Sequence, residues 1–449
     1  MGLMAIFPVE VRPLLPLYLT MLLEAVGSGL VASVLNIVAR DDLGCSSMQV
    51  GILWSSYNAA LILGSVCMGY LSDHIRRKYV LMLTLFWVGL GYILTAFSSN
   101  FTWFLVSRII TGLCGGSFSV AASILSANLH SDLLPYAIGR LGTVASLGFA
   151  IGPLISYAIT SIWDVSSSSP FYVQRLYFFF AALIYMLATL LASRLPKSIT
   201  PRTPSTAAQR SDGGSVAPGL CLVWSSRFFS TCGVTAVYVT QVFLWREYLG
   251  LDRMTISLAT TASGLATSVF QGLTFPFLVS KIGFHAALTL GIGLISLASA
   301  LLGLLTSKGG IAVHFSILIF FWFGLGCMEP GTPVAVARHL KQSSLRESSK
   351  GSSRFVVHTG LAMGITSAMK YAASLAVPTV AGYLYDTYKL AVYLCGSVVS
   401  SLGVVAVLVA WRLFERTERE ILARPIKADD EETATPTEST TGEDQVFHL

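Results

Sequence analysis

Long apolar segments alternate with short polar connections along almost the whole chain. Each segment has about 20 residues or more and few charges, which is what a helix needs to cross the hydrocarbon core of a bilayer. The pattern therefore predicts an all-α membrane protein with twelve transmembrane helices. The expected helices cover residues 14–39, 49–72, 79–98, 101–128, 136–162, 171–193, 221–246, 254–280, 284–306, 311–337, 356–385 and 389–413.

The composition excludes an ordinary soluble domain. Hydrophobic residues make up 54% of the chain, charged residues 12%, and the mean hydropathy is +0.69, whereas soluble domains carry about 25% charged residues. The sequence contains no phosphate-binding loop, hydrolytic triad or metal-ligand cluster. We therefore expect no enzyme activity, no cofactor and no metal. The net charge of +6 reflects basic residues on the inner side of a membrane, so no nucleic-acid partner is expected.

The distribution of Lys and Arg sets the expected topology. These residues are concentrated in the termini and the even-numbered connections, which places both termini in the cytoplasm. Residues 194–220 are rich in Pro, Ser, Thr and Gly, a composition typical of a linker, and they separate a six-helix bundle at 1–193 from another at 221–413. Residues 414–449 are acidic and are expected to form a disordered cytoplasmic tail.

The connection between the second and third expected helices resembles the signature loop of the major facilitator superfamily. Four positions match that motif: Gly69, Asp73, Arg77 and Lys78. Arg76 stands where the motif has its second glycine. The resemblance implies two bundles related by a pseudo-two-fold axis along the membrane normal, with the aspartate against the N-terminal end of the eleventh helix as a cytoplasmic latch. The alternative interpretation is a solvated turn that only sets orientation.

Four ionisable residues lie well inside expected helices: Glu24, Arg108, Glu329 and Lys370. A charge at mid-membrane costs at least ~2.5 kcal/mol, so such residues face a bundle interior and find partners. We expect Glu24 to pair with Arg108 and Glu329 with Lys370, and we expect these residues to couple protons or bind substrate. Purely structural ion pairs are the alternative.

Two helix motifs extend the resemblance. The segment from Arg108 to Gly116 resembles the fourth-helix motif of proton-coupled members, and Gly148, Gly152 and Pro153 resemble the fifth-helix antiporter motif. The glycines allow close helix contact and the proline bends the helix. The resemblance implies the drug:proton antiporter branch, which includes tetracycline-resistance proteins and organic-cation-transporter-like carriers.

Polar residues recur at helical spacing within otherwise apolar segments, which places them on single faces. The expected cavity-lining residues are Asn36, Tyr57, Asn58, Tyr238, Gln241, Gln271 and Tyr371. Their alternative role is hydrogen bonding between helices.

These features together favour a secondary active transporter that moves a small organic solute by alternating access, with proton antiport as the expected coupling. An uncoupled facilitator or a proton symporter, and a transport-dead receptor or scaffold, are the alternatives. The expected partners are an organic substrate, protons and the lipid bilayer, and the expected state is a monomer. A plasma membrane and a vacuolar or lysosomal membrane fit the sequence equally.

Overall fold

The structure is a computed structural model, and it is helical throughout the residues that it describes. These residues are 14–41, 43–45, 47–129, 133–163, 175–196, 218–247, 249–251, 253–348 and 359–422. Within them, ten helical segments are long and apolar enough to cross a membrane. The chain is therefore a multi-pass integral membrane protein, as the apolar pattern predicts.

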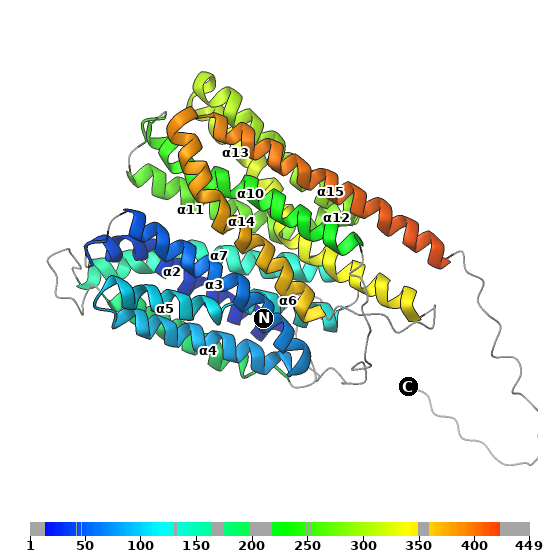
Figure 1. Cartoon of the computed structure of the whole chain (residues 1–449), viewed down its shortest axis with the longest axis horizontal. Coiled ribbons are helices and arrows are strands. Elements are labelled where there is room, and N and C mark those ends of the chain that lie inside the picture. The colour runs from blue at the N-terminus through cyan, green and yellow to red at the C-terminus, as the bar shows by residue number, and fades with distance from the viewer. Residues whose placement is uncertain are drawn as a thin grey trace, which may run out of the picture.

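The helices form two groups that lie side by side (Figure 1). The first group contains α2 (Leu15–Asp41), α3 (Ser47–His74), α4 (Arg77–Ala96), α5 (Phe101–Leu113), α6 (Ser117–Asn128), α7 (Leu134–Trp163) and α9 (Leu176–Ala192). The second contains α10 (Pro218–Glu247), α11 (Arg253–Val269), the π-helix η3 (Phe270–Thr274), α12 (Phe275–Ile282), α13 (Phe284–Ser348), α14 (Thr359–Tyr388) and α15 (Ala391–Leu422).

Two of the expected helices are interrupted in the structure. The segment expected at 101–128 divides into α5 and α6, because Gly116 adopts a φ of 121° that a helix does not allow. The segment expected at 254–280 contains the π-helical turn η3, a feature that often marks functional sites. The helices expected at 284–306 and 311–337 both lie within α13, which has a kink between them at Gly310, whose φ of 68° suits glycine.

Helix α14 is not among the ten candidate spans, and it carries polar side chains along one face. Ser367, Lys370, Tyr371 and Ser374 all line the central cavity described below. A helix that borders a cavity on one side does not need an apolar surface all round. The polar face of α14 therefore fits its position beside the cavity.

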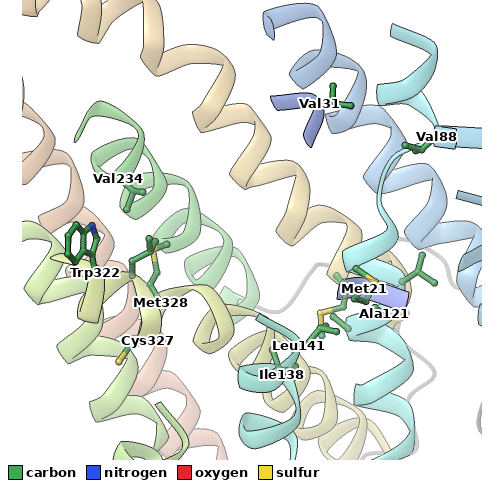
Figure 2. Close-up of a cluster of buried hydrophobic side chains, with 14 of the residues drawn as sticks. Met21, Val31, Val88, Ala121, Ile138, Leu141, Val234, Trp322, Cys327 and Met328 are labelled. Carbon is green, nitrogen blue, oxygen red and sulfur yellow. The ribbon is translucent and has the colours of Figure 1, made fainter. Parts of the chain in front are cut away.

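Buried apolar side chains from both groups make up the hydrophobic core. Helix α2 packs on α7 and α9, and α10 packs on α14 and α15. Figure 2 shows Met21, Ala121 and Leu141 of the first group set apart from Trp322 and Met328 of the second. Between the groups, α3 packs against α14, and α7 packs against α11 and η3. These contacts between the groups border the candidate site.

The expected linker and tail fall largely outside the described residues. Helix α10 begins at Pro218, slightly before the expected end of the linker, and residues 197–217 are not described. The tail expected from residue 414 is wrong at its start, because α15 continues to Leu422. Gln342 Nε2 donates to the Phe414 carbonyl at 2.9 Å and ties this extension to α13. Residues 423–449 lie outside the described part of the chain.

Candidate functional site

A cavity of about 810 Å³ lies between the two groups of helices. Helices α2, α3, α6 and α7 line one side, and α10, α11, η3, α13 and α14 line the other. This volume is in the range of sites that hold a small organic molecule. The expected site residues on its wall are Glu24, Asn58, Pro153, Tyr238, Gln271, Glu329, Lys370 and Tyr371.

Glu24 contacts hydroxyl groups from two other helices. Ser117 Oγ donates to Glu24 Oε1 at 3.2 Å, and the Tyr185 hydroxyl donates to the same oxygen at 3.3 Å. The Tyr185 hydroxyl also lies 2.7 Å from Ser28 Oγ. Among the described residues, no cation forms an ion pair with Glu24. The expected pair of Glu24 with Arg108 is therefore wrong.

Arg108 lies in a separate small chamber instead. Its Nη2 donates to Thr95 Oγ1 at 2.7 Å, and its guanidinium faces the rings of Tyr57 and Tyr92. The reason is the break between α5 and α6: Arg108 precedes the break, whereas Ser117, which reaches Glu24, follows it. In an unbroken helix, the spacing between Arg108 and Ser117 would have fixed the directions in which their side chains point. The break removes that relation.

On the opposite wall, Glu329 is held by two cations. Arg227 Nη2 lies 2.6 Å from Glu329 Oε2, and Lys370 Nζ lies 3.4 Å from Glu329 Oε1. The Arg227 side chain is 5% exposed, whereas that of Lys370 is 42% exposed. The expected proximity of Glu329 and Lys370 is present, with Arg227 as an additional and closer partner.

The sequence reasoning missed Arg227. It lies near the cytoplasmic end of its expected helix, where basic residues usually report only topology. The expected helix boundaries gave no signal for it, because Arg227 lies six positions after the expected helix start at 221 and Glu24 lies ten after that at 14. In the structure, Arg227 follows Pro218, the first residue of α10, by nine positions, and Glu24 follows Leu15, the first residue of α2, by the same nine.

The other residues expected to line the cavity do not all lie on its wall. Tyr57 lines the small chamber with Arg108, not the main cavity. Gln241 is buried and is not part of the cavity wall. Asn58 lines the cavity while its Nδ2 donates to the Trp54 carbonyl at 2.9 Å. The side chain of Asn36 lies outside the part of the structure that is described.

Gln271 belongs to the π-helical turn and bridges the two halves. Ser146 Oγ of α7 donates to Gln271 Oε1 at 3.1 Å, and Thr143 Oγ1 donates to the Ser268 carbonyl at 3.2 Å. A Cβ atom at Gly142 would lie 2.6 Å from Gln271 Oε1, so a side chain there would collide with the amide. The wide turn thus brings the Gln271 side chain against α7.

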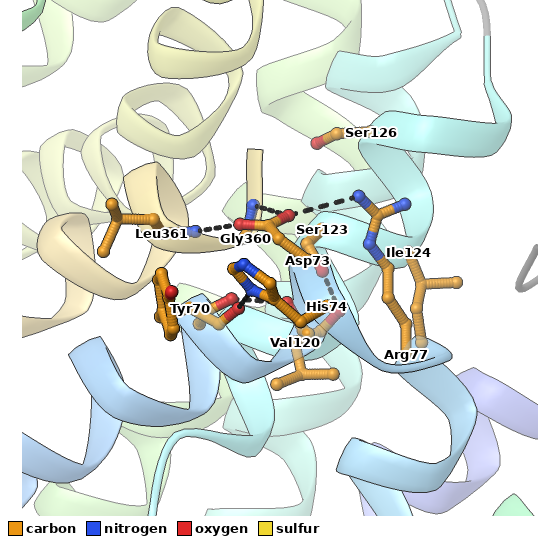
Figure 3. A network of polar contacts seen from close by, with 12 residues as sticks. Tyr70, Asp73, His74, Arg77, Val120, Ser123, Ile124, Ser126, Gly360 and Leu361 are labelled. Atoms are coloured by element: carbon orange, nitrogen blue, oxygen red, sulfur yellow. Dashed lines mark hydrogen bonds and ion pairs between the residues drawn. The ribbon is translucent and has the colours of Figure 1, made fainter. Parts of the chain in front are cut away.

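Asp73 connects the first group to the N-terminal end of α14 (Figure 3). The backbone N–H of Gly360 donates to Asp73 Oδ1 at 2.9 Å, and that of Leu361 donates to Oδ2 at 2.8 Å. Arg77 Nη2 lies 3.6 Å from Oδ1. Free N–H groups and the helix dipole both favour a carboxylate at this place. The position expected for Asp73 is the one observed.

The remaining signature-loop residues shape this contact. A Cβ atom at Gly69 would lie 2.4 Å from the Gly360 carbonyl oxygen, so only glycine allows the two helices to approach. Lys78 Nζ donates to the carbonyls of Ser193 and Leu195, each at 2.6 Å, and so ties α4 to the end of α9. Arg76 is half-buried just before α4. Asp73 and Lys78 are buried and therefore do not form a solvated turn.

The glycines of the fifth-helix motif pack directly against α2. A Cβ at Gly148 would lie 2.6 Å from the Leu22 carbonyl oxygen, and one at Gly152 would lie 2.3 Å from backbone atoms of Gly29 and Leu30. Pro153 cannot donate a backbone hydrogen bond to the residue four positions earlier and lines the cavity. In this motif, the two glycines allow α7 to pack closely on α2, and the proline bends α7 where it lines the cavity.

We expect Gly152→Ala to destabilise the protein. The added methyl group overlaps the α2 backbone, and overpacking of this kind typically costs about 1–3 kcal/mol. The measurement is thermal unfolding of the purified protein in detergent. Gly382→Ala in α14 is the matched control, because its Cβ would have nothing within 4 Å. Equal unfolding temperatures for the two variants would contradict the prediction.

Comparisons with known proteins agree with this geometry. The sequence profile of the Major Facilitator Superfamily matches residues 17–356. The chain is 26% identical over 308 residues to the class B tetracycline resistance protein of Escherichia coli, covering 66% of this chain and 74% of that protein. It is 24% identical over 283 residues to the class H protein of Pasteurella multocida, covering 61% and 68% of the two chains.

Solved structures share the fold at low sequence identity. The crystal structure of the human organic anion transporter MFSD10 (TETRAN) matches with a TM-score of 0.70 and 18% identity, covering 89% of this chain and 100% of that one. The Escherichia coli fucose:proton symporter FucP matches with a TM-score of 0.69 and 17% identity, covering 90% and 99%. The chain therefore belongs to the Major Facilitator Superfamily of membrane transporters.

Proposed function

We propose that the protein exchanges a small organic solute for protons by alternating access across the membrane. The observation that carries this proposal is the contrast between two carboxylates on opposite walls of one cavity. Glu24 has hydroxyl partners and no ion pair, whereas Glu329 has two cations. A proton and a cation compete for the same oxygen atoms, and no cation of the described residues lies within ion-pair distance of Glu24.

The partners of Glu24 suit a group that gains and loses a proton. The hydroxyls of Ser117 and Tyr185 can donate to a carboxylate and can also accept from a carboxylic acid. Such partners remain satisfied in both states, so a change of protonation leaves no buried polar atom unpaired. Glu329, between Arg227 and Lys370, acts in this proposal as a fixed charge that orders the cavity.

The proposed architecture is twelve transmembrane helices in two six-helix bundles related by a pseudo-two-fold axis, with both termini in the cytoplasm. Equivalent helix pairs in the two halves support it. The α2–α7 pair corresponds to α10–α14, and the contact of α3 with α14 corresponds to that of α7 with α11 and η3. The bound Asp73 then closes the cytoplasmic side, and the two halves rock about the cavity.

The relatives support an organic solute of small size. The curated relatives include tetracycline resistance proteins, and the human MFSD10 structure is that of an organic anion transporter. The cavity wall fits such a solute, because aromatic and amide groups such as Tyr238, Tyr371 and Gln271 stand among apolar residues. Groups of this kind hold amphipathic molecules by burial and by a few oriented hydrogen bonds.

The test is proton flux in proteoliposomes that contain a trapped pH dye. Organic cations, anions and zwitterions are added across a pH gradient, and we expect at least one compound to evoke flux opposite to its own movement. Glu24→Gln should abolish this flux while leaving downhill solute equilibration in place. Glu415→Gln, which removes an exposed carboxylate in α15, is the control and should behave as wild type.

Three outcomes would contradict the proposal. Solute movement without proton movement would indicate a facilitator, and proton movement in the same direction as the solute would indicate a symporter. Coupled flux of wild-type size in Glu24→Gln would remove Glu24 from the proton path.

A further inference from the structure

A small side chamber of about 110 Å³ lies beside the main cavity. Ser28, Trp54 and Phe149 line both spaces, so a molecule in the main cavity lies next to the chamber. Its remaining wall is apolar and aromatic, apart from the guanidinium of Arg108 and the hydroxyls of Tyr57 and Tyr92. The chamber is much too small for a whole organic solute, and its size suits one functional group or a single small ion.

Arg108 brings a positive charge to this chamber without a counter-charge. The residue is 3% exposed, and no carboxylate of the described residues forms an ion pair with it. Its Nη2 donates to Thr95 Oγ1 at 2.7 Å, and its buried Nε has no hydrogen-bond partner. Glu24, the acid expected to balance it, is held by Ser117 and Tyr185.

A buried unpaired guanidinium is costly, because its desolvation is not compensated by an opposite charge. Aromatic ring faces offset part of this cost. The Arg108 guanidinium carbon lies 5.1 Å from the Tyr92 ring centroid and 5.9 Å from that of Tyr57. Cation–π contacts use the faces of the guanidinium, so its in-plane N–H donors stay available for hydrogen bonds, and such donors bind anions. Nη2 donates to Thr95 and, at 3.4 Å, to Thr111, whereas Nε has no hydrogen-bond partner and can still bind an anion.

We propose that this chamber binds a small monoanionic group. The planar guanidinium suits a carboxylate, which can accept two parallel N–H bonds, and a halide ion would fit the same place. For a carboxylate, the body of the solute would occupy the main cavity, so the transported compound would be an amphipathic organic monoanion. The assignment of a substrate class rests on the proposed transport function, whereas anion binding itself does not.

The test is equilibrium binding to the purified protein in detergent, without transport. Tryptophan fluorescence, which includes that of Trp54 in the chamber wall, is followed during titration with benzoate, with its neutral analogue benzamide, and with chloride against gluconate at constant ionic strength. We expect saturable responses to benzoate or chloride and none to benzamide. Arg108→Gln should raise the dissociation constant at least tenfold, and Arg419→Gln, which removes an exposed cation, should leave it unchanged.

A second variant covers the case in which Arg108→Gln does not fold. Ala32 lines the chamber, and Ala32→Leu fills it while Arg108 remains, so the anion response should also be lost. A response to benzoate that chloride does not displace supports recognition of a solute carboxylate. Saturable chloride binding that excludes benzoate supports an inorganic anion site. Equal responses to benzoate and benzamide, or unchanged binding in both variants, would overturn the proposal whatever the proton-flux experiment shows.

Discussion

Replacing Asp73 by asparagine is expected to open the end of the molecule that α14 closes. The carboxylate accepts two backbone hydrogen bonds, from Gly360 and Leu361. An amide has one acceptor oxygen, so one of these N–H groups would face an NH₂ group. Hydrogen bonds to a charged group contribute about 1.5–3 kcal/mol each. Loss of one such bond should raise the open population about 10- to 100-fold, since 1.4 kcal/mol is a factor of ten.

The measurement is the distance distribution between spin labels at positions 75 and 280, at the ends of α3 and α12. Both positions are exposed, and they belong to opposite halves. The exposed native thiols are first replaced by serine, namely Cys67, Cys221 and Cys395. We expect one short distance in the otherwise wild-type protein and a second, longer population in Asp73→Asn. An unchanged distribution would show that the α3–α14 contact does not depend on this carboxylate.

Arg227→Gln is expected to destabilise the fold far more than Lys370→Gln. Arg227 is nearly buried and lies 2.6 Å from Glu329, whereas Lys370 is partly exposed and lies 3.4 Å away. Removing one partner of a buried ion pair typically costs ~3–5 kcal/mol, and a partly exposed pair is worth less than about 1 kcal/mol. Transport should fall at least tenfold in Lys370→Gln, because Lys370 is the more exposed of these two cations on the cavity wall.

Thermal unfolding and solute uptake, measured on the same preparations, separate these two effects. The double variant Arg227→Gln/Glu329→Gln is the control for charge imbalance, because it removes both members of the pair. Its stability should exceed that of Arg227→Gln alone, as expected for coupled neighbours. Similar destabilisation by Arg227→Gln and Lys370→Gln would instead assign Lys370 a structural role.

The contact of Asp73 with α14 shows what the resemblance to the superfamily predicted correctly in this protein. Asp73 ends one apolar segment next to basic residues, and a carboxylate in that place is attracted to the N–H groups at a helix start. Its observed partners, Gly360 and Leu361, are such groups. Helices α3 and α14 can approach closely because positions 69 and 360 are both glycine. A side chain at either Gly69 or Gly360 would collide with the other helix.

The partners of the charged residues inside the membrane could not be predicted from the sequence. Helical spacing gives the face on which a residue lies, but the rotation of one helix against another depends on packing along its whole length. The φ of 121° at Gly116 changes the direction of the chain between Arg108 and Ser117. Ser117 therefore meets Glu24, and Arg108 is left in its own chamber.

By itself, the sequence determined that this chain is a helical membrane protein and where most of its helices lie, because transfer of apolar side chains out of water is a property of local segments. The transporter class and the contact of Asp73 with a helix start were predicted through the resemblance to the superfamily. The tertiary structure decided that Glu24 has hydroxyl partners, that Arg227 joins Glu329 and that Arg108 forms no ion pair with a described carboxylate. Those outcomes depend on side-chain distances of a few ångströms, which only the packed arrangement of all helices sets.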